Sequence, residues 1–248
     1  MLNLNIYILQ AYNYIAIYGN KQVEMKNKMI LTQQLLERFF VIFNYTNEID
    51  IDYDNLIEIQ PDAFMNCRNR KIKTLRLQSK YPIKINSDHS SLFEPLKEHL
   101  EELNLKCSLE CEFNFLKHLE NLKKLTLNVI WGGIGKPVFN AANNQLTHLD
   151  LSNFENHSSH LKISDKTMFN DLTYLTHLDL SKVTVDDNVL PELFSELKQL
   201  DTLKLIRTKL TPTQDAFIYL KNLRELHFVD IQIPKECSNI FAPLKSLQ

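Results

Sequence analysis

The heptapeptide Leu-Thr-His-Leu-Asp-Leu-Ser occurs twice in this chain of 248 residues, at 146–152 and again at 175–181. Its leucines stand at the first, fourth and sixth positions, and the last two flank one polar residue, an alternation that is typical of a β-strand with one buried face. The same spacing recurs in seven clear copies, at Ile72/Leu75/Leu77, Leu100/Leu103/Leu105, Leu122/Leu125/Leu127, Leu146/Leu149/Leu151, Leu175/Leu178/Leu180, Leu200/Leu203/Leu205 and Leu223/Leu226/Phe228. Thr46/Ile49/Ile51 fits this frame more weakly, and Leu247 begins a further copy. The copies start at 46, 72, 100, 122, 146, 175, 200, 223 and 247, so the intervals are 26, 28, 22, 24, 29, 25, 23 and 24 residues, which predicts a repeat protein.

A second apolar pattern precedes each strand pattern. It pairs an aromatic or aliphatic residue with a second apolar residue three positions later, most clearly at Phe169/Leu172, Phe194/Leu197, Phe217/Leu220 and Phe241/Leu244. Looser versions are Phe64/Cys67, Phe93/Leu96, Leu116/Leu119 and Phe139/Ala142. One repeat is too short to bury its apolar face alone, so these residues should pack against those of the neighbouring repeats.

Both patterns together resemble the leucine-rich-repeat family over residues 46–248. The resemblance implies an α/β solenoid with a curved parallel sheet on its concave face and helices, 3-10 turns and loops on its convex face. We expect about eight repeats and a ninth that Leu247 opens, as in a fragment of a longer protein. The segments 59–64, 168–181 and 215–226 are most similar to repeats of extracellular receptors of the Toll-like kind. The asparagine that the family carries nine residues into each repeat is absent, because that place holds Asp54, Lys80, Ser108, Ile130, Phe154, Val183, Thr208 and Ile231.

Residues 1–45 do not fit the repeat and are interpreted as an N-terminal extension. Apolar residues with helical spacing predict a helix over about 29–43 that covers the end of the solenoid, namely Leu31, Leu35, Leu36, Phe39, Phe40 and Phe43. An alternative is that this spacing is similar to the opening helix of an F-box, a module that in its family docks onto a ubiquitin-ligase adaptor. Thr32 then replaces the usual proline, the only tryptophan is Trp131, and two residues separate Phe43 from Thr46, which leaves little room for the other F-box helices.

Composition argues against several classes of partner and site. The formal net charge is −2 and the pI about 6.4, so the chain has no global positive field for nucleic acid or an anionic membrane. Only 4 glycines are present, and the run from Trp131 to Gly135 is followed by Lys136 and Pro137, so it lacks the hydroxyl residue of a phosphate-binding loop, and we expect no nucleotide or other cofactor. No catalytic signature surrounds any serine, cysteine or histidine, and no enzyme is predicted.

Sequence features relevant to the compartment favour an intracellular protein in some respects and a secreted protein in others. Residues 1–20 lack charge, but interspersed asparagine and glutamine make them a poor signal peptide, and no stretch approaches the roughly 20 apolar residues of a membrane span. Cys67, Cys107, Cys111 and Cys237 show no clustered cap pattern, and no disulfide is assigned. Two triplets, at Asn44 and Asn156, are candidate N-glycosylation sites if the chain is secreted.

Side chains between the leucines of each strand should point away from the core and tile the concave face, because side chains alternate along a strand. This face carries both signs of charge and is more acidic near its start, which favours a protein partner with matching patches over a small ligand. The candidate partner-binding residues are Arg76, Glu102, Lys124, His148, Asp150, His177, Asp179, Lys182, Lys204, Arg207 and His227.

The repeated heptapeptide should also gather His148, Asp150, His177 and Asp179 into a square, with strands ~4.8 Å apart and alternate residues ~6.6 Å apart. Two imidazoles and two carboxylates could hold zinc. However, polar residues recur at these positions by repeat consensus, and a flat open sheet gives metal ligands little support. No metal site is therefore predicted.

The function expected from the sequence is recognition of a protein ligand by an extracellular, receptor-like ectodomain. Two alternatives remain open, an intracellular F-box-like substrate-recognition subunit of a ubiquitin ligase and a structural adhesion protein.

Overall fold

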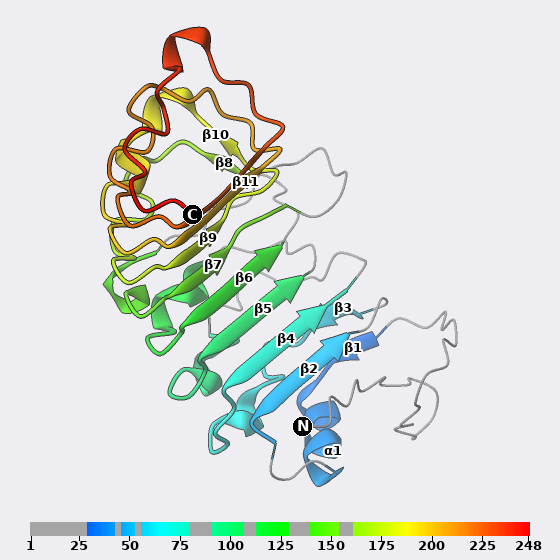
Figure 1. Ribbon diagram of the computed structural model, residues 1–248. Helices are drawn as coiled ribbons and strands as arrows, with labels where there is room; N and C mark the ends of the chain where they lie inside the picture. The colour runs from blue at the N-terminus through cyan, green and yellow to red at the C-terminus, as the bar shows by residue number, and fades with distance from the viewer. Residues whose placement is uncertain are drawn as a thin grey trace.

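A curved sheet of eight parallel strands forms the frame of the molecule (Figure 1). The computed structural model describes residues 29–42, 46–52, 56–79, 91–106, 113–128, 139–153 and 161–248. The strand order is β12-β11-β9-β7-β6-β5-β4-β2, so each strand lies beside the corresponding strand of the next repeat. The strands are β2 (Glu48–Asp52), β4 (Thr74–Gln78), β5 (Glu102–Lys106), β6 (Lys124–Asn128), β7 (His148–Asp150), β9 (His177–Asp179), β11 (Thr202–Ile206) and β12 (Glu225–Val229).

The leucine pattern sets the register of this sheet. Each strand begins two residues after the start of a sequence block, and equivalent leucines face one another, as in the pairs Leu103↔Leu125 and Leu149↔Leu178. A slip by one residue would turn every leucine outward, so burial of one face specifies the pairing. The predicted solenoid with a curved parallel sheet is confirmed.

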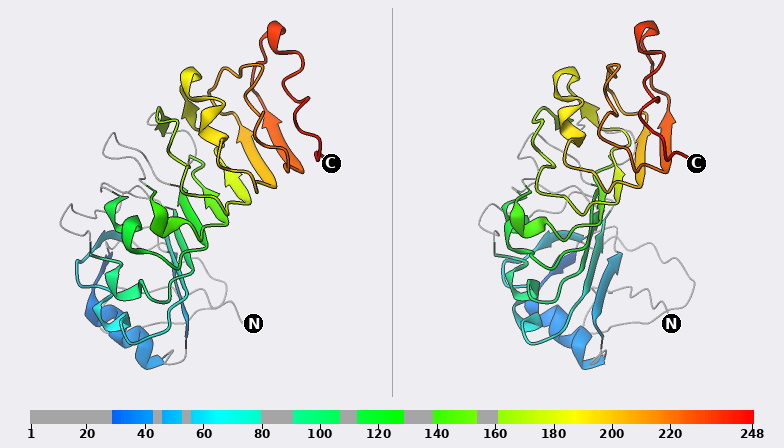
Figure 2. Two further views of the ribbon diagram at one scale, coloured as in Figure 1. Left: turned by 90° about the vertical axis from the view of Figure 1, so that its left-hand side faces the viewer. Right: turned by 60° about the vertical axis from the view of Figure 1, so that its left-hand side comes forward.

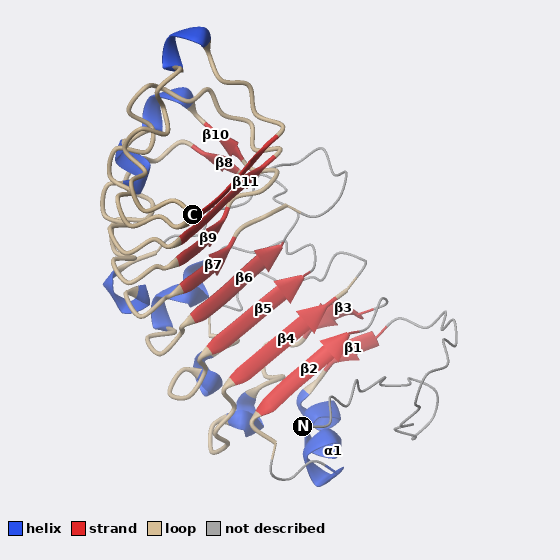
Figure 3. Cartoon of the chain, in the orientation of Figure 1, coloured by secondary structure: helices blue, strands red, loops and turns tan. Residues whose placement is uncertain are grey.

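The return segments on the convex side are short 3-10 turns and loops, as Figures 2 and 3 show. The turns are η1 (Met65–Cys67), η3 (Glu94–Leu96), η4 (Phe113–His118), η5 (Ala141–Asn143), η6 (Asp187–Val189), η7 (Glu192–Phe194) and η8 (Lys235–Cys237). Two further short strands, β8 (Lys162–Ile163) and β10 (Thr184–Val185), pair in parallel beside the main sheet, and Thr184 also bridges to Lys209.

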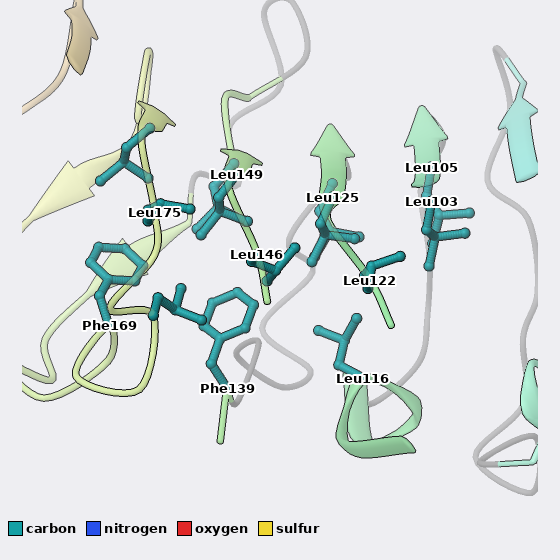
Figure 4. Close-up of a cluster of buried hydrophobic side chains, with 14 of the residues drawn as sticks. Leu103, Leu105, Leu116, Leu122, Leu125, Phe139, Leu146, Leu149, Phe169 and Leu175 are labelled. Atoms are coloured by element: carbon teal, nitrogen blue, oxygen red, sulfur yellow. The ribbon is translucent and has the colours of Figure 1, made fainter. Parts of the chain in front are cut away.

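The core lies between the strand leucines and the phenylalanines of the return segments (Figure 4). Rings of neighbouring repeats contact one another, with centroids 5.8 Å apart for Phe64 and Phe93 and 6.4 Å apart for Phe194 and Phe217. Phe217 touches three rings, since Phe228 and Phe241 also lie within 6.1 Å of it. The core is therefore continuous from repeat to repeat, as a solenoid requires.

One core position was assigned to the wrong residue. The sequence pairs Phe139 with Ala142, but Asn143 is the fully buried residue of η5, and Ala142 is only partly covered. Asn143 Nδ2 donates to the carbonyl of Leu116 at 2.8 Å, and Asn143 Oδ1 accepts from the backbone N–H of Asn140 at 3.2 Å. A hydrogen-bonded amide can occupy an apolar column because both of its ends are satisfied, which apolar spacing alone does not reveal.

The N-terminal segment covers the first repeat. The helix expected over about 29–43 is shorter than predicted, because residues 29–31 form β1 (Met29–Leu31), parallel to β3 (Leu56–Ile59), and α1 runs over Gln33–Ile42. Leu36 and Phe40 of α1 are buried, and the Arg70 guanidinium lies 4.0 Å from the centre of the Phe40 ring. Gln33 Nε2 donates to Asn66 Oδ1 of η1 at 2.8 Å. Within the described ranges, no helix has the length and apolar character needed to cross a membrane.

Candidate functional site

The concave face is built from the outward side chains of the eight strands. Along β4 and β5, leucines are buried while Thr74, Arg76, Glu102 and Asn104 are partly exposed. The same alternation continues across β7 and β9. The face is therefore a continuous polar surface presented on a rigid parallel sheet.

At its N-terminal part, Arg76 joins three carboxylates of two neighbouring strands. Its guanidinium pairs with Glu102 at 2.8 Å, contacts Glu48, and lies 3.8 Å from Asp50. Burial raises the pKa of Asp50, and the charges of Asp52 and Glu102 raise it further. The cluster carries more carboxylates than cations, so this part of the face is acidic, as the sequence predicts.

At the centre, His148 and His177 form a stacked pair. The rings lie 4.1 Å apart at an angle of 8°, and the register places the two residues opposite each other on β7 and β9. Their Nδ1 atoms lie 2.9 and 2.8 Å from the hydroxyls of Thr147 and Thr176. Burial lowers the pKa of His148, and the neighbouring His177 and Lys124 lower it further against an opposing effect of Glu102.

The two aspartates of the repeated heptapeptide do not close a square with these histidines. Asp150 and Asp179 each accept the backbone N–H of the serine two residues later, Ser152 and Ser181, at 2.9 Å. Burial raises the pKa of Asp150, while its hydrogen bonds to Ser152 oppose that rise. The carboxylates thus serve the turns that end their strands, and the described residues contain no group of three or more His, Cys, Asp or Glu arranged around a metal position.

At the C-terminal part, the predicted contact residues fall into two places. Lys204 lies on β11 with its Nζ 4.0 Å from Asp179, and His227 lies on β12 beside Glu225. Lys182 and Arg207, which we expected on the concave face, follow the strands and have positive φ values of 61° and 56°. Such a left-handed residue turns the chain away from the strand direction. These two cations therefore lie beyond the ends of the strands, at the edge of the concave face, which we call the rim.

A groove beside this rim was not visible in the sequence. It has a volume of about 730 Å³ and is lined by residues 184–187, 207–211 and 230–234 of three successive repeats. Arg207 pairs across it with Asp230 at 3.0 Å. Its walls are β10 with the residues that follow it and the loops after β11 and β12, and their separation depends on tertiary packing rather than on local pattern.

Polar side chains partly replace the missing asparagine ladder. Thr208 is buried and donates to the carbonyl of Leu180 at 2.8 Å, and Ser79 donates to the carbonyl of Leu56 at 3.0 Å. Asn153 is buried one position before the expected ladder place. Thr208, at the ladder place itself, and Ser79, one position before it, thereby satisfy backbone carbonyls at their turns.

Several sequence candidates lie outside the described residues. They are Asn44, Asn156, Cys107, Cys111 and the segment 131–135. Cys67 and Cys237 are buried free thiols, and burial raises the pKa of Cys67 to about 12. Cys67 therefore packs as a small apolar residue, in keeping with its position in the phenylalanine and leucine pattern.

Acidification should destabilise the fold through His148. Because its folded pKa lies below the ordinary 6.5, the unfolded chain binds protons more readily, and stability that is complete above pH 6.5 is lost as the pH falls toward the lowered value. We expect the free energy of unfolding, measured in urea, to fall between pH 7.5 and pH 5.5, and to fall less in His148→Gln. His227→Gln, a substitution on the exposed β12, serves as the control. Equal pH dependence in wild type and His148→Gln would contradict this assignment.

Comparison with known proteins supports the fold. No family sequence model matches the chain, and no curated protein sequence is significantly similar to it. Among solved structures, internalin C2 of Listeria monocytogenes is 19% identical with a TM-score of 0.54, over 81% of this chain and 78% of that one. TLR13, from a complex with the RNA ssRNA13, is 20% identical with a TM-score of 0.56, over 81% of this chain and 27% of that one. Toll, from the Drosophila Toll–Spatzle complex, is 17% identical with a TM-score of 0.55, over 84% of this chain and 30% of that one.

These neighbours are leucine-rich-repeat proteins, and the predicted resemblance, Toll-type structures included, is confirmed at the level of the fold. The chain spans less than a third of the two Toll-type chains that it matches.

Proposed function

We propose that this leucine-rich-repeat solenoid is a non-catalytic protein-recognition module that binds a protein partner through its concave face. The observation that carries the proposal is the uninterrupted sheet of eight strands, whose outward side chains form one polar surface with charges of both signs. Such a surface achieves specificity by charge and shape complementarity over a large area. The rigid backbone beneath it keeps the ordering cost of binding low.

The finer proposal is an extracellular, receptor-like ectodomain. Its support is the fold shared with the Toll and TLR13 chains and the two candidate glycosylation triplets at Asn44 and Asn156. A structural adhesion role would use the same face. The F-box alternative has less support, because Leu31, Leu36 and Phe40 are buried in the hydrophobic core of the chain's own solenoid and are not available to an adaptor.

Recognition through the concave face is tested with two double variants, each of which replaces two lysines by glutamate. Lys124→Glu/Lys204→Glu alters two sheet residues, whereas Lys198→Glu/Lys221→Glu alters two exposed lysines of the return turns. For a partner identified by cross-linking to the wild-type chain, the concave variant should bind at least about tenfold more weakly, about 1.4 kcal/mol. The matched variant should bind within about twofold of wild type. Equal weakening by both pairs, or by neither, would refute recognition through this face.

The compartment is tested on the protein made in its own cells. N-glycan on Asn156, detected as a mass shift that an endoglycosidase removes, would support the extracellular proposal. Copurification with a ubiquitin-ligase adaptor would replace it with the F-box alternative.

A further inference from the structure

A second, narrower ladder of parallel backbone segments runs along the C-terminal repeats, beside the main sheet (Figure 1). β8 pairs with β10, and β10 pairs with the segment 207–211 through Lys209. The Lys209 N–H donates to the carbonyl of Val183, and the Lys209 carbonyl accepts the N–H of Val185, both at 2.8 Å. The corresponding segment of the next repeat is 230–234, yet in the described part of the chain no backbone hydrogen bond joins it to 207–211. Both segments instead line the groove of about 730 Å³.

Two prolines explain why this ladder stops. Backbone groups alternate in direction along an extended segment, so the N–H and C=O of Leu210 face away from β10 and toward the groove, whereas those of Lys209 face β10. The repeat interval of 23 residues would place Ile233 opposite Leu210, and the N–H of residue 234 would then reach the Leu210 carbonyl. Residue 234 is proline, and so is residue 212, the next donor along the edge, so neither has an N–H. The sequence itself therefore leaves the backbone edge at Leu210 open.

The apolar column beneath this ladder becomes uncovered at the same place. Ile163 of β8 and Val185 of β10 are 0% and 3% exposed, whereas Leu210 is partly exposed and Ile233 is 39% exposed. Leu210 and Ile233 both line the groove. An extended segment in the groove would cover these two residues with one apolar side chain and remove apolar surface from water, which favours binding.

One cation of the groove has no carboxylate partner among the described residues. Lys209 is exposed and lines the groove, and none of the described carboxylates forms an ion pair with it. The other charged side chains of the groove are engaged, Arg207 with Asp230 at 3.0 Å, Asp186 with Lys162 at 3.0 Å, and Asp187 with the backbone N–H of Thr211 at 3.1 Å. The position next to the apolar side chain of an added strand lies opposite Lys209, so an acidic residue fits there.

We propose that the groove binds an extended peptide segment of a protein partner as an added parallel strand, with an apolar side chain over Leu210 and Ile233 and an acidic side chain beside Lys209. The added strand accepts the Leu210 N–H and donates to the Leu210 carbonyl. In such strand addition, main-chain hydrogen bonds provide affinity and alternate side chains provide specificity. This surface is separate from the concave face of the proposed function, so either proposal can fail without the other.

The probe is a fluorescein-labelled octapeptide of alternating valine and glutamate, titrated with the whole chain and followed by fluorescence anisotropy. In a parallel strand with valine over Leu210, the glutamate nitrogens face the Leu210 edge and the valine nitrogens face away. The peptide that is N-methylated on its glutamates should therefore bind at least about tenfold more weakly than the peptide that is N-methylated on its valines. A peptide with lysine in place of glutamate should also bind at least about tenfold more weakly than the probe, because its charge repels Lys209.

Two pairs of variants locate the site. Lys209→Glu and Ile233→Ser should each weaken binding of the probe at least about fivefold, whereas Lys221→Glu and Ile218→Ser should bind it within about twofold of wild type. Ile218 and Ile233 are 40% and 39% exposed, and both lysines are exposed, so the pairs differ in their place on the molecule. Circular dichroism verifies that every variant is folded.

The Lys124→Glu/Lys204→Glu variant, which tests the concave face, should bind the probe as wild type does. Loss of binding in this variant would place the peptide on the concave face and overturn the proposal. Wild-type affinity in Lys209→Glu and Ile233→Ser would overturn it as well, as would a wild-type chain that does not bind the probe at millimolar concentration. Equal binding of the two methylated peptides, or stronger binding of the one methylated on glutamate, would rule out a parallel strand on the Leu210 edge.

Discussion

Phe217→Ala should lower the free energy of unfolding by about 3–5 kcal/mol, the range for removing a buried aromatic ring from a core. Phe217 is 1% exposed, and its ring lies between those of Phe194 and Phe241, with centroids 6.4 and 6.0 Å away, while Phe228 meets it edge-on at 6.1 Å. Removal of the ring leaves a cavity that three neighbouring rings line. Because repeats contact mainly their neighbours, the loss should fall on the C-terminal repeats.

Urea denaturation measures the total effect, and hydrogen exchange locates it. The adjacent Ile218 is 40% exposed, so Ile218→Ala should change stability by less than about 0.5 kcal/mol. Amide protection should decrease relative to wild type in β11 and β12. It should stay near the wild-type level in β4 and β5. A Phe217→Ala variant as stable as Ile218→Ala would show that the ring column does not hold the repeats together.

Leu125→Asp should unfold the central repeats, with a loss of more than about 4 kcal/mol. Leu125 on β6 is 1% exposed, and Figure 4 shows it among the leucines that face the core. A carboxylate at this position would have no cation within the apolar core, and burial of an unpaired charge is strongly unfavourable. The variant should show loss of the cooperative urea transition and of the near-ultraviolet circular dichroism signal.

The preceding residue provides the control, since Lys124 is exposed on the same strand. Lys124→Asp places a carboxylate opposite Glu102, and such a like-charge pair across strands costs less than about 1 kcal/mol. The contrast between adjacent positions tests the alternation on which the concave face depends. Comparable losses in the two variants would mean that β6 does not present its side chains as described.

Strand positions were predictable because leucine spacing is a local property. Every block from the weak one at Thr46 to the one at Leu223 begins two residues before a strand of the sheet. The register follows because equivalent leucines of neighbouring strands lie opposite one another. The acidic character of the N-terminal part followed in the same way, because residues between leucines must point outward. Asn143 was missed, since a polar side chain that bonds the Leu116 carbonyl leaves no signal in an apolar pattern.

The candidate site was only partly predictable. Opposed positions of His148 and His177 follow from the repeated heptapeptide, but the ring stacking and the turn of the aspartates toward Ser152 and Ser181 do not. Side-chain rotamers depend on which hydrogen-bonding groups lie within reach, and these groups belong to the following turn or the adjacent strand. The rim positions of Lys182 and Arg207 depend likewise on a left-handed turn after the strand.

The repeated Leu-Thr-His-Leu-Asp-Leu-Ser and its relatives determined by themselves that this chain is a leucine-rich-repeat solenoid with a polar concave face. They could do so because each block specifies a strand, and similar blocks bury their leucines only by stacking in parallel. Tertiary structure alone decided the imidazole pair, the groove beside the rim and the buried amide of Asn143. Those features arise between repeats whose connecting loops differ in length, so their geometry depends on distances that no single repeat encodes.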